Sequence, residues 1–170
     1  MYRRFITLFI GILFCLPLFA HESSDTRTLK LYNDATKETL TITYYEKGNY
    51  IESSLNKLDY FMRDWRADKY IKMDRKLYNI IECISHSGGH IVYVLNAYRT
   101  PETNEKLREA QPNVAKNSLH TKGRAIDFRI RGHSLDRIVA KAVGCHAGGI
   151  GKYKNGSFIH IDTGRKGRRW

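Results

Sequence analysis

The sequence predicts a single α+β domain. Short segments that alternate apolar and polar residues, typical of strands, are mixed with segments that repeat apolar residues every three to four positions, typical of helices. They do not follow one another in the regular βαβ order of a parallel α/β fold. The chain has 170 residues, of which 42% are hydrophobic and 12% aromatic, and this composition argues against disorder. It contains no internal repeat and no low-complexity stretch, which excludes a solenoid or a coiled coil.

The fold is expected to begin with a β-hairpin and a helix. Residues 28–32 and 40–45 alternate and are rich in β-forming residues, and Asn33-Asp34 between them is a turn signal. Residues 51–66 predict a helix because their apolar residues recur on one stripe. The stripe consists of Leu55, Leu58, Phe61, Met62 and Trp65. We expect all of them to face the core.

A second helix and a buried strand follow. Residues 75–86 again place apolar side chains on one helical face, and Asp74 in front of them is a suitable N-cap. The run Ser87-Gly88-Gly89 is expected to end this helix. Residues 91–95 are apolar or aromatic throughout and bounded by polar residues, which predicts a buried strand.

The next segment predicts a helix, a loop and a strand. Threonine caps helices and proline fits their first turn, so Thr100 and Pro101 indicate a helix that runs to about Ala110. Residues 111–119 are polar and predict a loop. Residues 124–130 have the pattern of a strand.

A last helix and a hairpin complete the domain. Ser134 is expected to cap a helix that carries one more apolar stripe. This stripe consists of Leu135, Ile138, Val139, Ala142 and Val143. Residues 148–153 and 157–163 flank Asn155-Gly156, which is a strong signal for a tight hairpin turn.

The first twenty residues have the layout of a secretory signal peptide. Residues 2–4 carry two arginines, residues 5–19 are almost wholly apolar, and Ala20 is a small residue at the expected cleavage point. An uncleaved anchor is the alternative, but fifteen apolar residues are short for a membrane span, which needs about 20. We therefore expect a signal peptide over residues 1–20 and one domain over residues 21–170. That domain would be periplasmic or secreted, with no stable membrane insertion after cleavage.

Two cysteines, Cys83 and Cys145, lie in the expected exported part. In an oxidising compartment they can form a disulfide. Two buried free thiols are the alternative. Two isolated cysteines without a Cys-x-x-Cys spacing do not indicate a zinc cage.

The most informative stretch joins a histidine to an acid in a strand. Asp127 follows His120 by seven residues and lies inside a predicted strand, where an acid is disfavoured. Because strand side chains alternate, Asp127 points away from its two apolar neighbours and needs a polar partner. Gly123 permits a tight turn between the histidine and the acid.

A second polar pair lies in the last predicted strand. His160 and Asp162 are two residues apart and share one face, while the isoleucines beside them share the other. If this strand lies beside that of Asp127, the pair joins His120 and Asp127 in one cluster. Two imidazoles and a carboxylate can hold a catalytic zinc, which activates a water near neutral pH. An ordinary His–Asp hydrogen bond is the alternative, and spacing alone does not decide between the two.

Both groups of residues belong to one sequence motif. It reads Ser118-x-His120-x-x-Gly123-x-Ala125-x-Asp127, followed by His160-x-Asp162. With this motif the chain resembles the zinc D-alanyl-D-alanine peptidases, which share a fold with lysostaphin-type peptidases and hedgehog signalling domains. The similarity extends into residues 98–104, and residues 31–33 and 58–66 resemble the exported YcbK-like murein endopeptidases. The resemblance covers nearly all of residues 28–170 and implies a central, mostly antiparallel sheet flanked by helices.

The resemblance also implies roles for particular residues. His120, Asp127 and His160 would hold Zn²⁺. Arg99 would grip a substrate carboxylate or the scissile carbonyl oxygen, and Ser118 would orient the loop or the substrate at the edge of the site. The reaction would be hydrolysis, by metal-activated water, of an amide bond in peptidoglycan stem peptides or cross-links. The YcbK-like subgroup favours an endopeptidase over a D-Ala-D-Ala carboxypeptidase.

One position departs from the pattern of the family. Many relatives place Glu or Asp, the general base, three residues before the last zinc histidine, where this chain has Ser157. Asp162 is expected to be the catalytic substitute, because it shares a strand face with His160. The alternative is that Asp162 holds His160 in the correct tautomer. His133 and His146 are weaker candidates for a role in the site.

The formal net charge of +12 predicts an acidic partner or a solvated basic surface. Four of the cations lie close together near the end of the sequence, at Arg165, Lys166, Arg168 and Arg169. For an exported protein we expect peptidoglycan as the partner and no nucleic acid. Two other functions remain compatible with the sequence. One is a zinc-containing peptidoglycan-binding module that has lost turnover, and the other is a secreted nucleic-acid binder.

Overall fold

A computed structural model describes residues 25–86, 88–111 and 114–170. Its strands are β1 (Arg27–Asn33), β2 (Thr39–Glu46), β3 (Asn49–Tyr50), β4 (Ile91–Asn96), β5 (Ala125–Arg129), β6 (Ile150–Tyr153) and β7 (Phe158–Asp162). Its helices are α1 (Glu52–Phe61), α2 (Arg75–Ser85), α3 (Pro101–Ala110), the short 3₁₀ helix η1 (Leu119–Lys122) and α4 (Leu135–Gly144). The predicted elements are confirmed to within about two residues at most ends, whereas β3 and η1 were not predicted.

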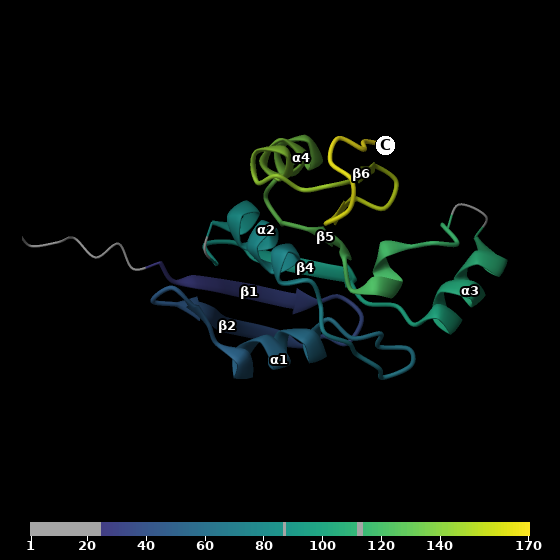
Figure 1. Ribbon diagram of the computed structural model, residues 1–170. Coiled ribbons are helices and arrows are strands. Elements are labelled where there is room, and N and C mark those ends of the chain that lie inside the picture. The colour runs from purple at the N-terminus through teal and green to yellow at the C-terminus, as the bar shows by residue number, and fades with distance from the viewer. Residues whose placement is uncertain (1–24, 87, 112–113) are drawn as a thin grey trace, which may run out of the picture.

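The strands form one seven-stranded sheet in the order β3-β2-β1-β4-β5-β7-β6. Strands β1 and β4 are parallel, and every other pair of neighbouring strands is antiparallel. The helices α1 and α2 lie in the connection between the hairpin β1–β2 and β4, which a parallel pairing of β1 with β4 requires. The predicted α+β class with a mostly antiparallel sheet is thereby confirmed (Figure 1).

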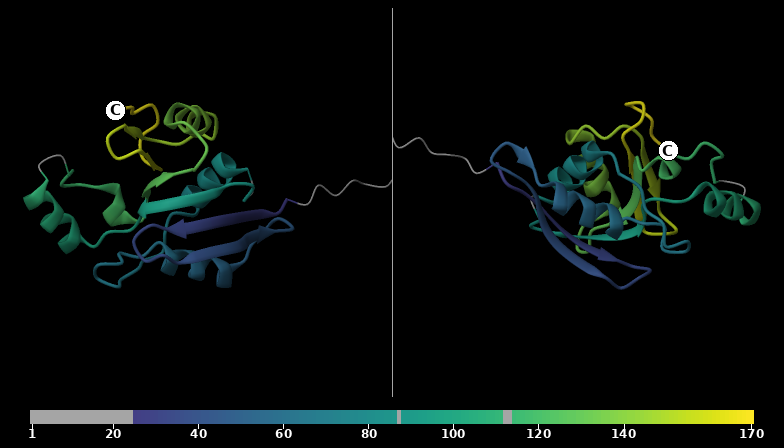
Figure 2. Two further views of the ribbon diagram at one scale, coloured as in Figure 1. Left: turned by 180° about the vertical axis from the view of Figure 1, so that it is seen from behind. Right: turned by 60° about the horizontal axis from the view of Figure 1, so that its bottom comes forward.

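The hydrophobic core lies between the sheet and helices α1, α2 and α4. Each of these helices packs on strands of the sheet, and α2 also packs on α4. Ile126 and Phe128 of β5, with Ile159 and Ile161 of β7, are fully buried in this core. Helix α3 stands away from the other three helices (Figure 2). Burial of one face of β5 and β7 leaves their other face free to carry polar side chains.

The first helix ends earlier than the sequence predicts. Helix α1 stops at Phe61, and Trp65, expected in the core, is 42% exposed. The cause is Asp64, a buried acid whose carboxylate accepts the backbone N–H of Thr100 at 2.9 Å and that of Arg66 at 3.1 Å. A buried carboxylate needs such donors, and the chain leaves the helical path to supply them. The prediction of a helix to residue 66 was therefore wrong.

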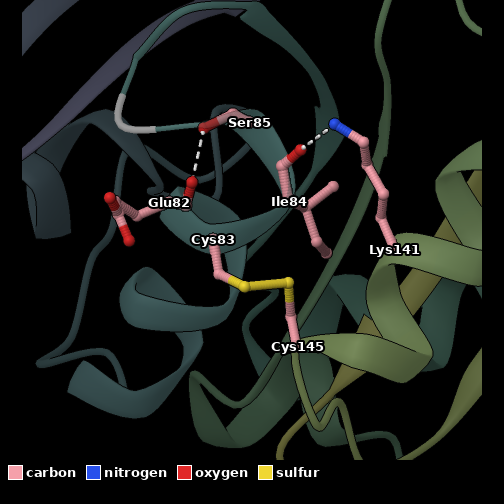
Figure 3. Close-up of a disulfide and its surroundings, with 6 residues drawn as sticks. All are labelled: Glu82, Cys83, Ile84, Ser85, Lys141 and Cys145. Carbon is pink, nitrogen blue, oxygen red and sulfur yellow. Dashed lines mark hydrogen bonds between the residues drawn. A yellow bond between two sulfur atoms is a disulfide. The ribbon is translucent and has the colours of Figure 1, made fainter.

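The two cysteines form a disulfide. Cys83 lies in α2 and Cys145 directly follows α4, and their Cα atoms are 5.9 Å apart (Figure 3). Beside the disulfide, the Lys141 side chain donates to the backbone carbonyl of Ile84 at 3.3 Å. Of the two alternatives left open by the sequence, the structure has the disulfide, which ties together two helices on the core side of the sheet.

The predicted signal peptide, residues 1–20, lies outside the described residues, so it stays a prediction together with the boundary at residue 21. Within the described part of the chain, no helix has both the length and the apolar character needed to cross a bilayer.

Candidate metal centre

The centre is built on two strands that lie next to each other. Strands β5 and β7 are antiparallel, and Asp127 is directly opposite His160. Their neighbours along each strand are buried in the core, so alternation turns both polar side chains to the opposite face. We call this the site face, and Asp162 of β7 lies on it as well. The sequence prediction that these three side chains share a face is confirmed.

His120 reaches the same place from η1, whose two ends are fixed by neighbouring residues. At its start, the Ser118 hydroxyl accepts the backbone N–H of His120 at 3.3 Å. At its end, Gly123 has a φ of 64°, a conformation in which glycine has no steric penalty. A side chain at residue 123 would also lie 3.1 Å from Ile71 and from Met73. The turn between the two polar groups therefore depends on glycine, as the sequence indicates.

Three donor atoms from these segments form a small triangle. Nε2 of His120 lies 3.2 Å from Nδ1 of His160 and 3.3 Å from Oδ1 of Asp127. Nδ1 of His160 lies 2.9 Å from the same carboxylate oxygen. Zinc has bonds of about 2.0–2.1 Å to such ligands in a tetrahedron, which separates the ligand atoms by roughly 3.3 Å. The spacing of the three atoms fits a zinc ion, and all three residues are buried.

The outer hydrogen bonds leave lone pairs inside this triangle. Nδ1 of His120 donates to the carbonyl oxygen of Ala97 at 2.7 Å, because a carbonyl can only accept. Nε2 of His160 donates to Oδ2 of Asp162 at 3.4 Å for the same reason. When both rings are neutral, the remaining ring nitrogens are both acceptors, and they face each other beside a carboxylate oxygen. Such a donor set fits a cation.

The charges of the centre support the same conclusion. Burial by itself would raise the pKa of Asp127, but attraction and hydrogen bonding from both histidines lower it. Burial by itself would lower the pKa of His160, but Asp127 and Asp162 outweigh it and raise the pKa to about 9. In the metal-free chain, Asp127 and Asp162 therefore keep His160 protonated. A bound metal ion would take the place of this positive charge.

Asp162 lies on the side of His160 away from the triangle, and both of its carboxylate oxygens accept hydrogen bonds. Its Oδ1 accepts the backbone N–H of Gly149 at 2.8 Å and that of Gly164 at 2.7 Å, while Oδ2 accepts from His160. A side chain at residue 149 would clash with Oδ2. Burial raises the pKa of Asp162, but these donors lower it further, to about 2. Asp162 contacts the ring nitrogen outside the triangle, which favours the orienting role over the role of base.

Arg99 supplies a buried cation beside the centre. It lies between β4 and α3, is only 8% exposed, and its Nε has no hydrogen-bond partner. Burial lowers the pKa of the guanidinium, and Asp127 acts in the opposite direction. An arginine nevertheless stays charged in proteins. A charged, buried and incompletely paired guanidinium is a site for an anionic or carbonyl oxygen of a ligand.

Comparison with known proteins places the chain in a family. A family model described as "Peptidoglycan L,D-endopeptidase MepK" matches residues 21–170. The chain belongs to this family. Its resemblance to murein endopeptidases, inferred above from the motif, is thereby confirmed.

Members of the MepK family from two bacteria illustrate the similarity. "Peptidoglycan L,D-endopeptidase MepK" of Escherichia coli is 38% identical over 157 residues, which cover 91% of this chain and 86% of that protein. "Probable peptidoglycan L,D-endopeptidase MepK" of Haemophilus influenzae is 38% identical over 163 residues, covering 94% and 87%. Among solved structures, Serratia marcescens L-Ala D-Glu endopeptidase ChiX matches 53% of this chain and 79% of its own, at 13% identity and a TM-score of 0.42.

Three residues considered from the sequence lie outside the triangle in this MepK-family chain. Ser157 is exposed in the turn between β6 and β7. His133 packs against His90, with ring centroids 4.5 Å apart, and His146 is exposed after α4. None belongs to the group of His120, Asp127 and His160, the candidate metal ligands among the described residues.

Sequence reasoning missed one neighbour of the centre. The ring of Trp170, which follows the basic residues at 165–169, has its centroid 5.3 Å from that of His160. One signal was present: Gly151 interrupts a strand on the face of His160, and a glycine in a strand often marks the close approach of another group.

Proposed function

We propose that this chain is a zinc metallopeptidase that hydrolyses an amide bond in peptidoglycan stem peptides or their cross-links. The observation that carries the proposal is the triangle of donor atoms from His120, Asp127 and His160, with separations that suit zinc. The names of the relatives support an endopeptidase acting on an L,D bond, rather than a carboxypeptidase.

In this proposal His120, Asp127 and His160 hold the metal. The ion would supply Lewis acidity and lower the pKa of a bound water towards neutrality. The chain's own contribution is to keep both imidazoles in the ligating tautomer: Ala97 does so for His120, and Asp162 for His160.

Arg99 and Ser118 are proposed to act on the substrate side. The buried Arg99 guanidinium would bind the scissile carbonyl oxygen or a stem-peptide carboxylate, stabilising negative charge that develops during hydrolysis. Ser118 already bonds the backbone of His120, which favours a role in holding η1 at the edge of the site. Both roles are those that the family resemblance implies.

The proposed location follows from the proposed substrate. Peptidoglycan lies outside the cytoplasmic membrane, so the chain would act in the periplasm or outside the cell after removal of residues 1–20. The disulfide between Cys83 and Cys145 suits an oxidising compartment. Without residues 1–20, whose two arginines contribute +2 to the total of +12, the net charge is +10, which suits an anionic wall polymer.

One observation favours a second candidate, a zinc-containing binding module without turnover. Among the described residues, both carboxylates of the centre are engaged, Asp127 in the triangle and Asp162 behind His160, and the position of the usual base is the exposed Ser157. Binding of stem peptides without cleavage would follow if no other group moves the proton.

Digestion of purified muropeptides by the zinc-loaded chain, followed by mass analysis, tests the proposal. New fragments that end at an L,D bond are expected. Intact muropeptides together with measurable binding would favour the module, and the absence of both would refute both candidates. The masses of the fragments also identify the bond.

A further inference from the structure

The edge of the site beyond His160 is built from aromatic residues. On the outer strand β6, Gly151 is opposite His160, and Tyr153 is opposite Phe158. Side chains of paired residues lie on the same face of a sheet, so Tyr153 belongs to the site face. Its ring stacks on that of Phe158, with centroids 4.6 Å apart and planes 10° from parallel. Tyr153 is nevertheless 40% exposed, so a substrate can reach it.

Trp170 reaches the site by pairing along β6. Its backbone carbonyl accepts the N–H of Lys152 at 2.8 Å, and its N–H donates to the carbonyl of Ile150 at 3.2 Å. The chain end therefore lies beside β6 (Figure 1). A side chain on Gly151 would come within 2.6 Å of the indole Nε1, so the glycine leaves the space that the indole fills. The indole thereby lies next to His160.

A hydrogen bond between Trp170 and Tyr153 fixes the direction of the phenol. The indole Nε1–H donates to the Tyr153 hydroxyl oxygen at 2.8 Å. An indole nitrogen can only donate, so the phenol oxygen is the acceptor and its own hydrogen stays available. Stacking on Phe158 limits rotation of the ring. Tyr153 thus offers one hydrogen-bond donor whose position is set by two contacts.

This donor and Arg99 flank the triangle from opposite sides. Arg99 follows β4, Asp127 and His160 lie on β5 and β7, and Tyr153 lies on β6, which is the order of these strands in the sheet. Tyr153 is also close enough to Arg99 to influence the pKa of its guanidinium. The Arg99 guanidinium and the Tyr153 hydroxyl are therefore placed on either side of the triangle, where both can donate to one substrate oxygen between them.

We propose that Tyr153 is a further catalytic residue that donates its hydroxyl hydrogen to a carbonyl oxygen of the stem peptide, and that Trp170 is the positioning residue that fixes this hydroxyl. The inference rests on the proposed function, because it names a contact for the same substrate. Its physical basis is that donors held in place before reaction stabilise charge that develops on the carbonyl oxygen. A purely structural role, in which the two rings only cover His160, is the competing explanation.

Two conservative substitutions separate the two explanations. Tyr153→Phe keeps the ring and its stacking but removes the hydroxyl, and Trp170→Phe keeps an aromatic cover but removes the N–H. Tyr45→Phe is the matched control, since Tyr45 lies on β2, with four strands between it and β6. Each variant and the double variant are measured for zinc content, melting temperature, and kcat and KM on muropeptides.

We expect Tyr153→Phe to lower kcat by about 10- to 100-fold, with zinc content and melting temperature unchanged. Trp170→Phe should lower kcat by about 3- to 10-fold, and the double variant should be no slower than Tyr153→Phe, because both changes affect one hydrogen-bonded unit. Wild-type kcat in Tyr153→Phe would overturn the proposal. A further loss from Trp170→Phe in the double variant would overturn the positioning role.

A binding measurement distinguishes failure of this inference from failure of the proposed function. Calorimetry with a non-hydrolysable phosphinate analogue of the stem peptide requires no turnover. If the wild type does not cleave but binds the analogue at least 10-fold more tightly than Tyr153→Phe, hydrolysis is refuted and the contact stands. Equal affinity of the two proteins, or no binding by either, would refute the contact.

Discussion

At the scale of single residues, the chemistry of the centre depends on which atoms donate and which accept hydrogen bonds. Arg99 is the clearest case, because its guanidinium is buried, charged and incompletely paired next to the triangle. Buried polar groups are rarely left without a hydrogen-bond partner, because an unpaired buried donor costs about 1–3 kcal/mol. That cost is recovered if a substrate oxygen completes the hydrogen bonding.

The first prediction concerns the shape of that cation. Arg99→Lys keeps the charge but loses the planar pair of donors, so we expect kcat on muropeptides to fall by about 10- to 100-fold with full zinc content. Arg75→Lys is the control, because Arg75 is a half-exposed residue of α2 whose ion pair with Glu52 lies in another part of the molecule. A rate equal to that of the wild type in Arg99→Lys would remove Arg99 from the site.

The second prediction separates the two roles of Asp162. If this carboxylate orients His160, Asp162→Asn should weaken zinc affinity by about 10- to 100-fold and leave kcat at saturating zinc nearly unchanged. Zinc titration and turnover measured on the same samples provide both numbers. A collapse of kcat at full zinc occupancy would instead identify Asp162 as the catalytic base.

At the scale of elements, the sequence predicted most of the helices and strands because each carries its own pattern. The alternation in β5 and β7 was enough to place Asp127 and His160 on one face. The end of α1 could not be predicted, because it depends on a bond from Asp64 to the distant Thr100. The pairing of Trp170 with β6 was missed for the same reason: contacts between remote segments leave no periodic signal.

The third prediction concerns the link between α2 and α4. The disulfide closes a loop of 62 residues, for which the loss of chain entropy in the unfolded state amounts to about 4 kcal/mol. The variant with both Cys83→Ser and Cys145→Ser should lose stability of that order in urea unfolding. Its turnover below the melting temperature should be retained, because the disulfide lies on the core side of the sheet.

Reduction provides the control for this prediction. A thiol reductant should lower the stability of the wild type towards that of the double variant and leave the variant unchanged. Equal stability of oxidised wild type and double variant would show that the cross-link contributes nothing.

At the scale of the whole molecule, the charge distribution governs how the chain meets its partner. The net charge of +12 includes three exposed cations, Arg165, Lys166 and Arg168. They lie in the segment that leads to Trp170, whose ring is next to that of His160. Attraction between exposed charges weakens with salt, because the screening length falls from about 10 Å at 0.1 M to about 3 Å at 1 M.

The fourth prediction follows from that screening. Binding of the chain to purified peptidoglycan should weaken steeply between low and high salt, and Arg165→Gln with Lys166→Gln should reduce the salt dependence. Sedimentation with insoluble peptidoglycan measures both effects. Binding that is independent of salt would mean that the basic surface is merely solvated.

The family and the candidate ligand residues could be inferred from the sequence, but their arrangement in space could not. The motif spacing left open whether His160 and Asp127 form a simple hydrogen bond or a metal site. Only the folded chain places the two next to His120, with the ring nitrogens facing each other at 3.2 Å. Likewise, only the folded chain shows that the Asp162 carboxylate contacts Nε2 of His160, outside the triangle, which is the contact expected of an orienting residue rather than of a base.

The most direct test of the central claim is the zinc content of the purified chain, measured by mass spectrometry after removal of loosely bound metal. We predict one zinc per chain in the wild type, none in His120→Ala, and one in His146→Ala, whose histidine is exposed and outside the triangle. Zinc retained by His120→Ala at the level of the wild type would contradict the account.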